Sequence, residues 1–245
     1  MRVSQAWSAF PTTRWTLVCA ATGDGPETRR ALSALCEAYW YPLYGYARHR
    51  GDSPEQAQDH TQEFFTQFLE HDYFDRANPD RGRFRSFLLA SFRHFLCDEA
   101  GRVSAKKRGG GAIPLSFEFY RGEERYAREP FHNETPERLY ERQWAHAVVD
   151  RTLARLRGEF VQNGRGEYFD QMKSFLQGDP ETSYAELAQR LKTNESALKV
   201  SIHRQRKRYR DLLRAEVADV VADPADVDAE LRYLIGALTG TYDQA

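Results

Sequence analysis

Apolar residues recur at intervals of three and four along most of this chain, and no stretch alternates apolar and polar positions as a half-buried strand does. The spacing predicts amphipathic helices over residues 28–50, 53–71 and 83–101, and Pro42 is expected to kink or divide the first of them. After a polar stretch, the same periodicity resumes near residue 137. The pattern therefore predicts an all-α protein with two small helical domains joined by a flexible linker.

Changes in composition mark the boundaries between these parts. The polar stretch follows the basic, glycine-rich run KKRGGG at residues 106–111, which is typical of a flexible linker. The chain ends in an acidic segment with a short amphipathic helix around residues 231–238. The predicted segments are an N-terminal extension over 1–27, a first helical domain over 28–108, a linker over 109–136, a second helical domain over 137–215 and an acidic C-terminal extension over 216–245.

The composition favours a folded protein of the reducing cytoplasm. Of the 245 residues, 41% are hydrophobic and 13% are aromatic, which is enough for buried cores. The cysteines Cys19, Cys36 and Cys97 lie far apart and form no CxxC pair, so no disulfide framework is expected. No apolar run approaches the roughly 18 residues of a membrane span, and the N-terminus lacks the apolar core of a signal peptide. We therefore expect a cytoplasmic protein with no membrane partner.

The formal net charge of −1, taken for the whole chain, argues against nucleic-acid binding. The net charges of separate segments give a different result. Residues 52–80 carry a net charge of −7, and residues 81–108 carry +6. Residues 192–214 again carry +6, and residues 215–245 carry −6. Charge runs are usually solvated helix faces, but each basic block here lies beside a recognisable motif. The segregation therefore points to two surfaces suited to nucleic acid.

A helix-turn-helix pattern lies in the second domain. Residues 183–191 form a predicted first helix with Ser183 and Glu186 as a capping box, and residues 195–209 form a second helix after a three-residue turn. In this design the second helix places its N-terminal residues against base edges in the major groove, and cations that follow meet phosphates. The candidate DNA-contacting residues are Ser196, Lys199, Val200, His203, Arg204, Arg206, Lys207 and Arg208.

Together the two domains resemble the extracytoplasmic-function (ECF) subfamily of sigma-70-type RNA polymerase sigma factors. Residues 184–188 (YAELA) and 197–208 are similar to the two helices of region four. Residues 56–65 (QAQDHTQEFF) lie where region two has an acidic Asp-Ala-Glu-Asp motif, and residues 84–102 are similar to its promoter-melting helix. The resemblance implies an initiation factor that binds core RNA polymerase and promoter DNA, with no catalytic residue, cofactor or metal.

The same resemblance assigns roles to particular residues. Region two would bind the β′ clamp of the polymerase through Glu55, Gln58, Asp59, Gln62 and Glu63. It would bind the melted −10 element through Phe84, Arg85, Ser86, Arg93, His94, Arg102, Lys106, Lys107 and Arg108. Melted strands need cationic grooves and aromatic platforms, which this set supplies. Region four would bind the −35 element as duplex through the helix-turn-helix, together with the β flap.

The acidic motif departs from the family pattern because Gln56 and Gln58 replace two acids. Some ECF groups with this weakening are linked to serine/threonine kinases, and a phosphate would add about −1.5 to −2 charges. Thr61 and Thr66 are the candidate acceptors, although Thr61 falls on the apolar face, where a core-edge residue is the preferred interpretation. The partner that controls the protein is therefore left open between an anti-sigma factor and a Ser/Thr kinase.

Other departures concern the turn, the melting helix and the tail. Lys192 stands where a turn glycine is usual, and a positive φ at this residue would cost about 1 kcal/mol. His94 replaces an expected asparagine, which leaves the promoter sequence undefined. The acidic C-terminal extension either shields the basic recognition helix as a brake or contributes a packing helix, and the packing helix is the preferred interpretation.

Functions of other classes find less support in the sequence. The chain contains no P-loop, GxSxG or HExxH motif and no Cys/His spacing typical of zinc sites, so we expect no enzyme. The main alternative is a stand-alone helix-turn-helix DNA-binding transcriptional regulator. Such a regulator would not need the first domain, and no coiled coil for dimerisation is evident.

Overall fold

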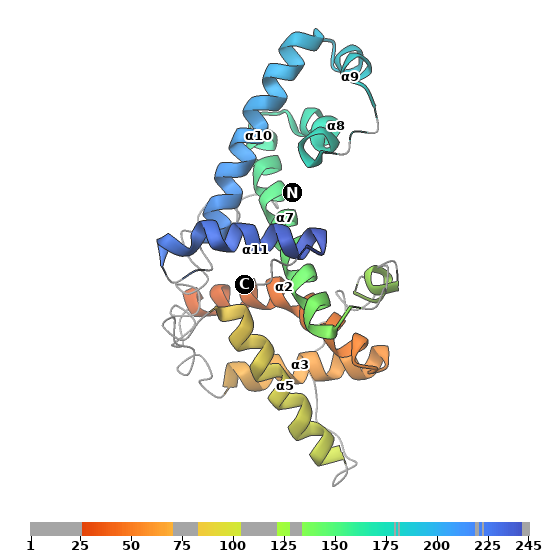
Figure 1. Ribbon diagram of the computed structural model, residues 1–245, viewed down its shortest axis with the longest axis vertical. Helices are drawn as coiled ribbons and strands as arrows, with labels where there is room; N and C mark the ends of the chain where they lie inside the picture. The colour runs from red at the N-terminus through yellow and green to blue at the C-terminus, as the bar shows by residue number, and fades with distance from the viewer. Residues whose placement is uncertain are drawn as a thin grey trace. The chain divides into compact units, whose positions relative to one another are not determined.

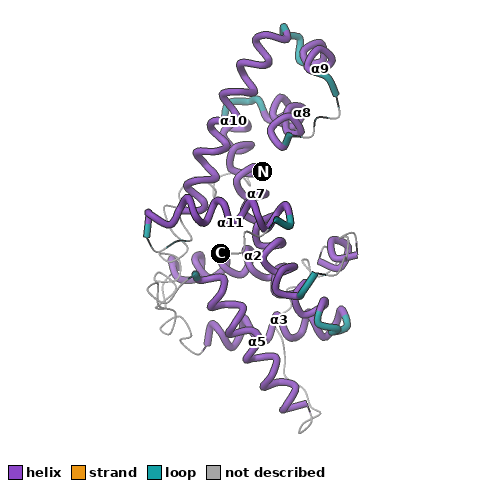
Figure 2. The backbone as a smooth tube through the Cα atoms, in the orientation of Figure 1, coloured by secondary structure: helices purple, strands orange, loops and turns teal. Residues whose placement is uncertain are grey.

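The computed structural model describes residues 26–70, 83–103, 122–127, 134–178, 180, 182–218, 221 and 223–241. Every regular element in these residues is helical, and Figures 1 and 2 show no strand among them. The all-α prediction is therefore confirmed for the part of the chain that the structure describes. The predicted N-terminal extension lies outside it, apart from its last two residues.

The helices follow the predicted periodic segments closely. They are α2 (Pro26–His49), α3 (Pro54–Glu70), α5 (Phe84–Val103), α7 (Pro136–Gln162), α8 (Gly166–Gln177), α9 (Tyr184–Arg190), α10 (Glu195–Ala218), the 3-10 turn η2 (Pro224–Asp226) and α11 (Val227–Thr239). Pro42 lies inside α2, which continues to His49, so the helix is not divided there. Residues 122–127 are also helical.

The chain forms two compact units. The residues up to Ala145 and those after Ala218 make up unit 1, and residues 146–218 make up unit 2. The break falls within α7, whereas the predicted domain boundary lies at residue 137, near the start of this helix. The predicted C-terminal extension from residue 219 onward, which includes α11, groups with unit 1, and its first three residues belong to unit 2.

Aromatic side chains fill the core of unit 1. The ring centroid of Phe64 in α3 lies 5.0 Å from that of Phe92 in α5, in an edge-to-face arrangement. Tyr39 of α2 makes a similar contact at 5.5 Å with Phe84 of α5, and all four rings are buried. Each buried aromatic or aliphatic side chain contributes about 1.5–3 kcal/mol, so these contacts fix α3 and α5 against α2.

The predicted capping box at the start of α3 is present. The backbone N–H of Ser53 donates to Gln56 Oε1 at 3.0 Å, and the backbone N–H of Gln56 donates to Ser53 Oγ at 3.2 Å. Pro54 occupies the first helical position, where its missing N–H costs nothing. These local interactions favour a helix start at this position.

Residues 122–127 lie within the segment predicted to be a flexible linker, yet they pack against α2. Arg48 donates from Nε and Nη2 to the two carboxylate oxygens of Glu123 at 3.1 and 3.0 Å, and the Tyr44 hydroxyl donates to the same carboxylate. A Cβ at Gly122 would lie 3.0 Å from the Trp40 ring, so the backbone approaches α2 closely. The predicted linker is thus ordered at this point, and residues 109–121 and 128–133 lie outside the described residues.

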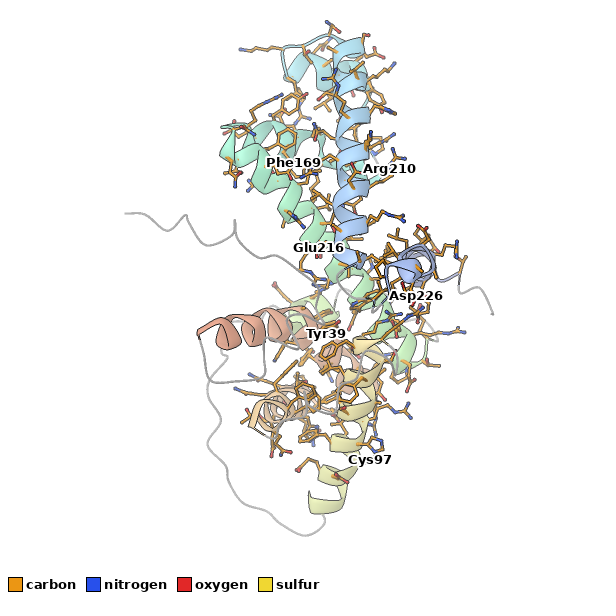
Figure 3. All side chains as sticks on the ribbon, turned by 90° about the vertical axis from the view of Figure 1, so that its left-hand side faces the viewer. Tyr39, Cys97, Phe169, Arg210, Glu216 and Asp226 are labelled. Carbon is orange, nitrogen blue, oxygen red and sulfur yellow. The ribbon has the colours of Figure 1, made fainter. Side chains whose placement is uncertain are left out.

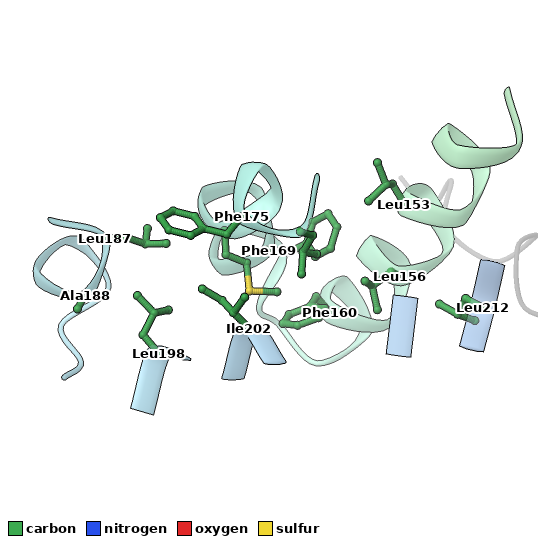
Figure 4. Packing of buried hydrophobic residues seen from close by; sticks show 12 residues of the cluster. Leu153, Leu156, Phe160, Phe169, Phe175, Leu187, Ala188, Leu198, Ile202 and Leu212 are labelled. Atoms are coloured by element: carbon green, nitrogen blue, oxygen red, sulfur yellow. The ribbon is translucent and has the colours of Figure 1, made fainter. Parts of the chain in front are cut away.

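The core of unit 2 joins α7, α8, α9 and α10, and Figure 4 shows its side chains facing one another between these helices. The buried residues are Leu153, Leu156, Phe160, Phe169, Met172, Phe175, Leu176, Leu187, Ala188, Leu198, Ile202 and Leu212. Gly178 ends α8 in the left-handed conformation with φ 88°, which a glycine adopts without strain. Over the described ranges, no helix combines the length and the apolar character needed to cross a membrane.

Candidate nucleic-acid interface

The helix-turn-helix of unit 2 has the predicted local structure. Ser183 caps α9 by accepting from the backbone N–H of Glu186 at 3.2 Å, and the Glu186 carboxylate accepts from the backbone N–H of Ser183 at 2.8 Å. The Asn194 side chain caps α10 by accepting from the backbone N–H of Ala197 at 2.7 Å. Both helices therefore begin at side chains that satisfy free backbone N–H groups.

The turn between the two helices places Lys192 at φ 51°, the one positive φ of a non-glycine residue among the described residues. The next backbone N–H, that of Thr193, donates to the carbonyl of Ala188 at 2.9 Å and closes the end of α9. The turn thus keeps the geometry that glycine would favour, and Lys192 bears the strain.

Replacing Lys192 with glycine is expected to raise the free energy of unfolding by about 0.5–1 kcal/mol, because glycine adopts this conformation without a Cβ clash. Urea denaturation of the two proteins measures the difference. Gly164 is the matched reverse case, since its φ is 68° and a Cβ at this position would meet nothing within 4 Å. Gly164→Ala should lower stability by a similar amount, and equal stability of Lys192→Gly and the parent would contradict the strain.

The exposed face of α10 carries most of the predicted DNA-contacting residues. Leu198, Ile202 and Leu212 point into the core and are almost fully buried. The side opposite this stripe is exposed and includes Ser196, Val200, His203, Arg204 and Lys207. Figure 3 shows the same division, with Phe169 of α8 in the core and Arg210 on the outside of α10.

Three of the predicted cations on α10 have partners within unit 2. Lys199 forms an ion pair with Glu195 at 2.5 Å, one helical turn earlier. Arg208 donates from Nε and Nη2 to the carboxylate of Glu159 at 3.1 and 2.6 Å, and Arg206 donates twice to the carbonyl of Phe175. Arg206 thus satisfies a free carbonyl in the last turn of α8, which is a structural role that its sequence position did not reveal.

The first turn of α5 does not present the predicted −10 contacts to solvent. Phe84 is buried against Tyr39, so its ring cannot stack on a base, and Arg85 is only 2% exposed. Its Nε donates to Glu141 of α7 at 2.7 Å, and its Nη1 donates to Glu230 of α11. In this conformation packing within unit 1 uses both side chains, so neither Phe84 nor Arg85 is presented to DNA, and their roles in binding the −10 element stay predictions that require a rearrangement.

The Arg85 guanidinium is also enclosed by aromatic rings. It lies 4.2 Å from the ring centroid of Trp144 and 4.5 Å from that of Tyr233. Burial by itself would lower the pKa of Arg85, but the charges of Glu141 and Glu230 outweigh burial and raise this pKa. For Glu141, burial raises the pKa more strongly than the Arg85 charge lowers it. One feature of the sequence points to this cluster, since Glu230 occupies a position on the apolar side of α11.

Farther along α5, several predicted −10 residues remain on an exposed face. Ser86, Arg93 and His94 are exposed, and the Arg93 side chain makes one long ion pair of 3.7 Å with Glu137. The side chain of Arg102, together with Lys106, Lys107 and Arg108, lies outside the described residues.

The predicted polymerase-binding residues on α3 divide by burial. Glu55, Asp59 and Glu63 are exposed and recur every four residues, so they form one acidic stripe along the helix. Gln58 is half-buried, and Gln62 is buried. The acidic character predicted for this surface therefore rests on three carboxylates.

The two candidate phosphorylation sites are not equivalent. Thr61 is fully buried and its Oγ1 donates to the carbonyl of Ala57 at 2.7 Å, as a core-edge residue would. Thr66 is half-buried, and its hydroxyl donates to the carbonyl of Gln62 at 3.0 Å. In this conformation a kinase cannot reach the hydroxyl of Thr61.

His60 of α3 is expected to titrate above its ordinary pKa of 6.5. The hydrogen bond of His60 Nδ1 with Asp52 Oδ2, at 2.9 Å, raises this pKa, and partial burial opposes it. The pair therefore stabilises the fold below pH 6.5, and this contribution is lost as the pH rises through the folded-state pKa. An NMR titration of the imidazole measures this pKa, and Asp52→Asn should lower it. An unchanged value in Asp52→Asn would contradict the assignment.

Within the described ranges, no group of three or more His, Cys, Asp or Glu side chains is arranged to hold a metal ion. The arrangement offers instead an exposed basic helix face in unit 2, and in unit 1 an acidic stripe and a mixed polar face on α5. Comparisons of this chain with protein-family models, with curated proteins and with solved structures find no match.

Proposed function

We propose that this protein is a cytoplasmic sigma factor of the ECF type, which binds core RNA polymerase and directs promoter recognition and melting. The observation that carries the proposal is the helix-turn-helix of unit 2, whose second helix buries an apolar stripe and exposes Arg204 and Lys207 on the opposite face. Neither side chain has an ion-pair partner in the described part of the chain, so both can meet phosphates.

Unit 1 supports the polymerase-binding half of the proposal. The acidic stripe of α3 is suited to a basic protein surface, and its charges are exposed rather than used in packing. We propose that Glu55, Asp59 and Glu63 contact the β′ clamp, and that the exposed face of α5 with Arg93 and His94 contacts the melted −10 strand. Control would come from an anti-sigma factor or from a Ser/Thr kinase.

A stand-alone DNA-binding regulator is the second candidate. The observation that favours it is the burial of Phe84 and Arg85, which removes two expected contacts with a melted strand. Under this alternative unit 2 binds duplex DNA, and unit 1 has no role in initiation.

Run-off transcription with reconstituted core polymerase distinguishes a sigma factor from a stand-alone DNA-binding regulator. Templates randomised at the −35 and −10 positions should yield transcripts with the protein present and none with core alone. Replacing Glu55, Asp59 and Glu63 with glutamine should abolish these transcripts while duplex binding by unit 2 remains. Duplex binding without any transcript would support the regulator.

The DNA face is tested by Arg204→Ala and Lys207→Ala. Each should weaken duplex binding and reduce the slope of log affinity against log salt concentration by about 1, because one phosphate contact is lost. Arg157→Ala is the matched control, since this exposed arginine of α7 pairs with Asp170 at 2.7 Å and its replacement removes the same charge. An equal loss in all three variants would show that only net charge matters.

A further inference from the structure

Two arginines at the start of α5 form ion pairs with the same carboxylate, that of Glu230 in α11. Arg83 directly precedes the helix and Arg85 lies in its first turn, and the two positions are called the head of α5 below. Arg83 Nε lies 2.9 Å from Glu230 Oε2, and Arg85 Nη1 donates to the other oxygen, Oε1. The guanidinium carbons of Arg83 and Arg85 lie 4.9 and 4.5 Å from the ring centroid of Tyr233, also on α11. Glu230 is fully buried by these contacts. The helix α11 thus places the Glu230 carboxylate and the Tyr233 ring against the guanidinium groups of Arg83 and Arg85.

A nucleotide of single-stranded DNA also presents an anion and an aromatic ring, namely its phosphate and its base. Guanidinium groups bind phosphate oxygens as they bind carboxylate oxygens, and arginine planes stack on bases as they stack on aromatic side chains. Glu230 and Tyr233 therefore occupy the head of α5 in the way that a phosphate and a base would. The carboxylate of Glu230 and a strand of DNA cannot hold these cations at the same time.

The geometry also allows DNA to replace α11 at Arg83 and Arg85. A helix of 13 residues is only marginally stable without packing, so the attachment of α11 depends on its contacts. Arg83 remains 40% exposed beside the docked helix, so a phosphate can reach it first. Arg85 keeps its hydrogen bond to Glu141 of α7 when Glu230 leaves, so its position does not depend on α11 alone.

We propose that α11 is an intramolecular competitor of single-stranded DNA for the Arg83–Arg85 cation pair at the head of α5. The proposal rests on the proposed role of α5 in contacting a melted strand, and it adds Arg83 to the contacting residues. Release of α11 exposes the pair, and binding of a strand displaces α11.

Fluorescence anisotropy of the full chain with a labelled oligonucleotide of about 20 nucleotides tests the competition. Glu230→Gln keeps the shape of the side chain and removes its charge, and is expected to raise the affinity for the single strand about five- to tenfold. Asp226→Asn is the matched control, because this exposed acid at the start of α11 makes no capping hydrogen bond and its replacement removes the same charge. Equal affinities of the two variants, or no binding by either, would overturn the proposal.

Hydrogen exchange of the unmodified protein gives a readout that does not depend on how a variant folds. Adding the oligonucleotide should speed the exchange of amides in residues 227–239, while duplex DNA should leave it unchanged. Unchanged or slower exchange with the single strand would show that α11 is a fixed part of unit 1 and would overturn the proposal. Neither measurement contains polymerase, so a failure of run-off transcription alone would count against the proposed function and not against the competition.

Discussion

Replacing Arg85 with methionine is expected to lower the free energy of unfolding by about 3–5 kcal/mol, which is the usual effect of removing one partner from a buried ion pair. The substitution leaves Glu141 without its cation, and it leaves the fully buried Glu230 with the partly exposed Arg83 alone. A buried carboxylate that loses its partner must either stay charged at high cost or bind a proton. Urea denaturation measures the loss.

The loss should also depend on pH. Without Arg85, only the charge of Arg83 still opposes the burial that already raises the pKa of Glu141, so this pKa rises further. A carboxyl group with a raised folded-state pKa is favourable below its unfolded value and costs stability as the pH rises through the folded value. The difference between Arg85→Met and the parent should therefore shrink as the pH is lowered.

Two further variants separate the buried charge from the lost side chain. Arg93→Met removes an arginine from the same helix, but that side chain is 57% exposed and its ion pair is long, so we expect a change within about 0.5 kcal/mol. Combining Arg85→Met with Glu141→Gln and Glu230→Gln should recover most of the stability, since no uncompensated charge remains. A loss below about 1 kcal/mol for Arg85→Met alone would contradict the assignment of this cluster.

Much of the fold could be predicted from the sequence because helix caps and helix faces are set by residues that lie close together along the chain. The capping boxes at Ser53 and Ser183 form from residues three positions apart, and both are present as expected. The buried stripe of α10 at Leu198, Ile202 and Leu212 likewise follows from the helical repeat alone. The exposed part of the candidate DNA face could be predicted for the same reason.

The head of α5 could not be predicted in this way. A motif identifies Phe84 and Arg85 by residue type, but their burial depends on α7 and α11, whose contributing residues lie 56 and 145 positions away from Arg85. The net charge of the acidic tail does not reveal that Glu230 is the acid of α11 that is buried together with apolar residues. Tertiary partners of this kind decide whether a basic side chain serves packing or ligand binding.

The helices α2 and α7 approach each other closely at Gly45 of α2. Glycine is unfavourable inside a helix, so helix propensity alone does not explain this residue. A Cβ at Gly45 would lie 2.3 Å from Gln143 Oε1 and 2.7 Å from its Cδ. Gln143 of α7 is fully buried, so its side chain has little room to move away. The glycine is therefore needed for space and not for backbone conformation.

Gly45→Ala is accordingly expected to lower the free energy of unfolding by about 1–3 kcal/mol, the cost of overpacking a filled core. Gly158 of α7 is the matched control, because it is also inside a helix but a Cβ there meets nothing within 4 Å. Gly158→Ala should raise stability by about 0.5–1 kcal/mol through helix propensity. Shortening the neighbour in the double variant Gly45→Ala with Gln143→Ala should make the two effects non-additive, since the alanine then has space. Strict additivity, or a stabilising Gly45→Ala, would show that Gln143 moves freely and that the contact is not tight.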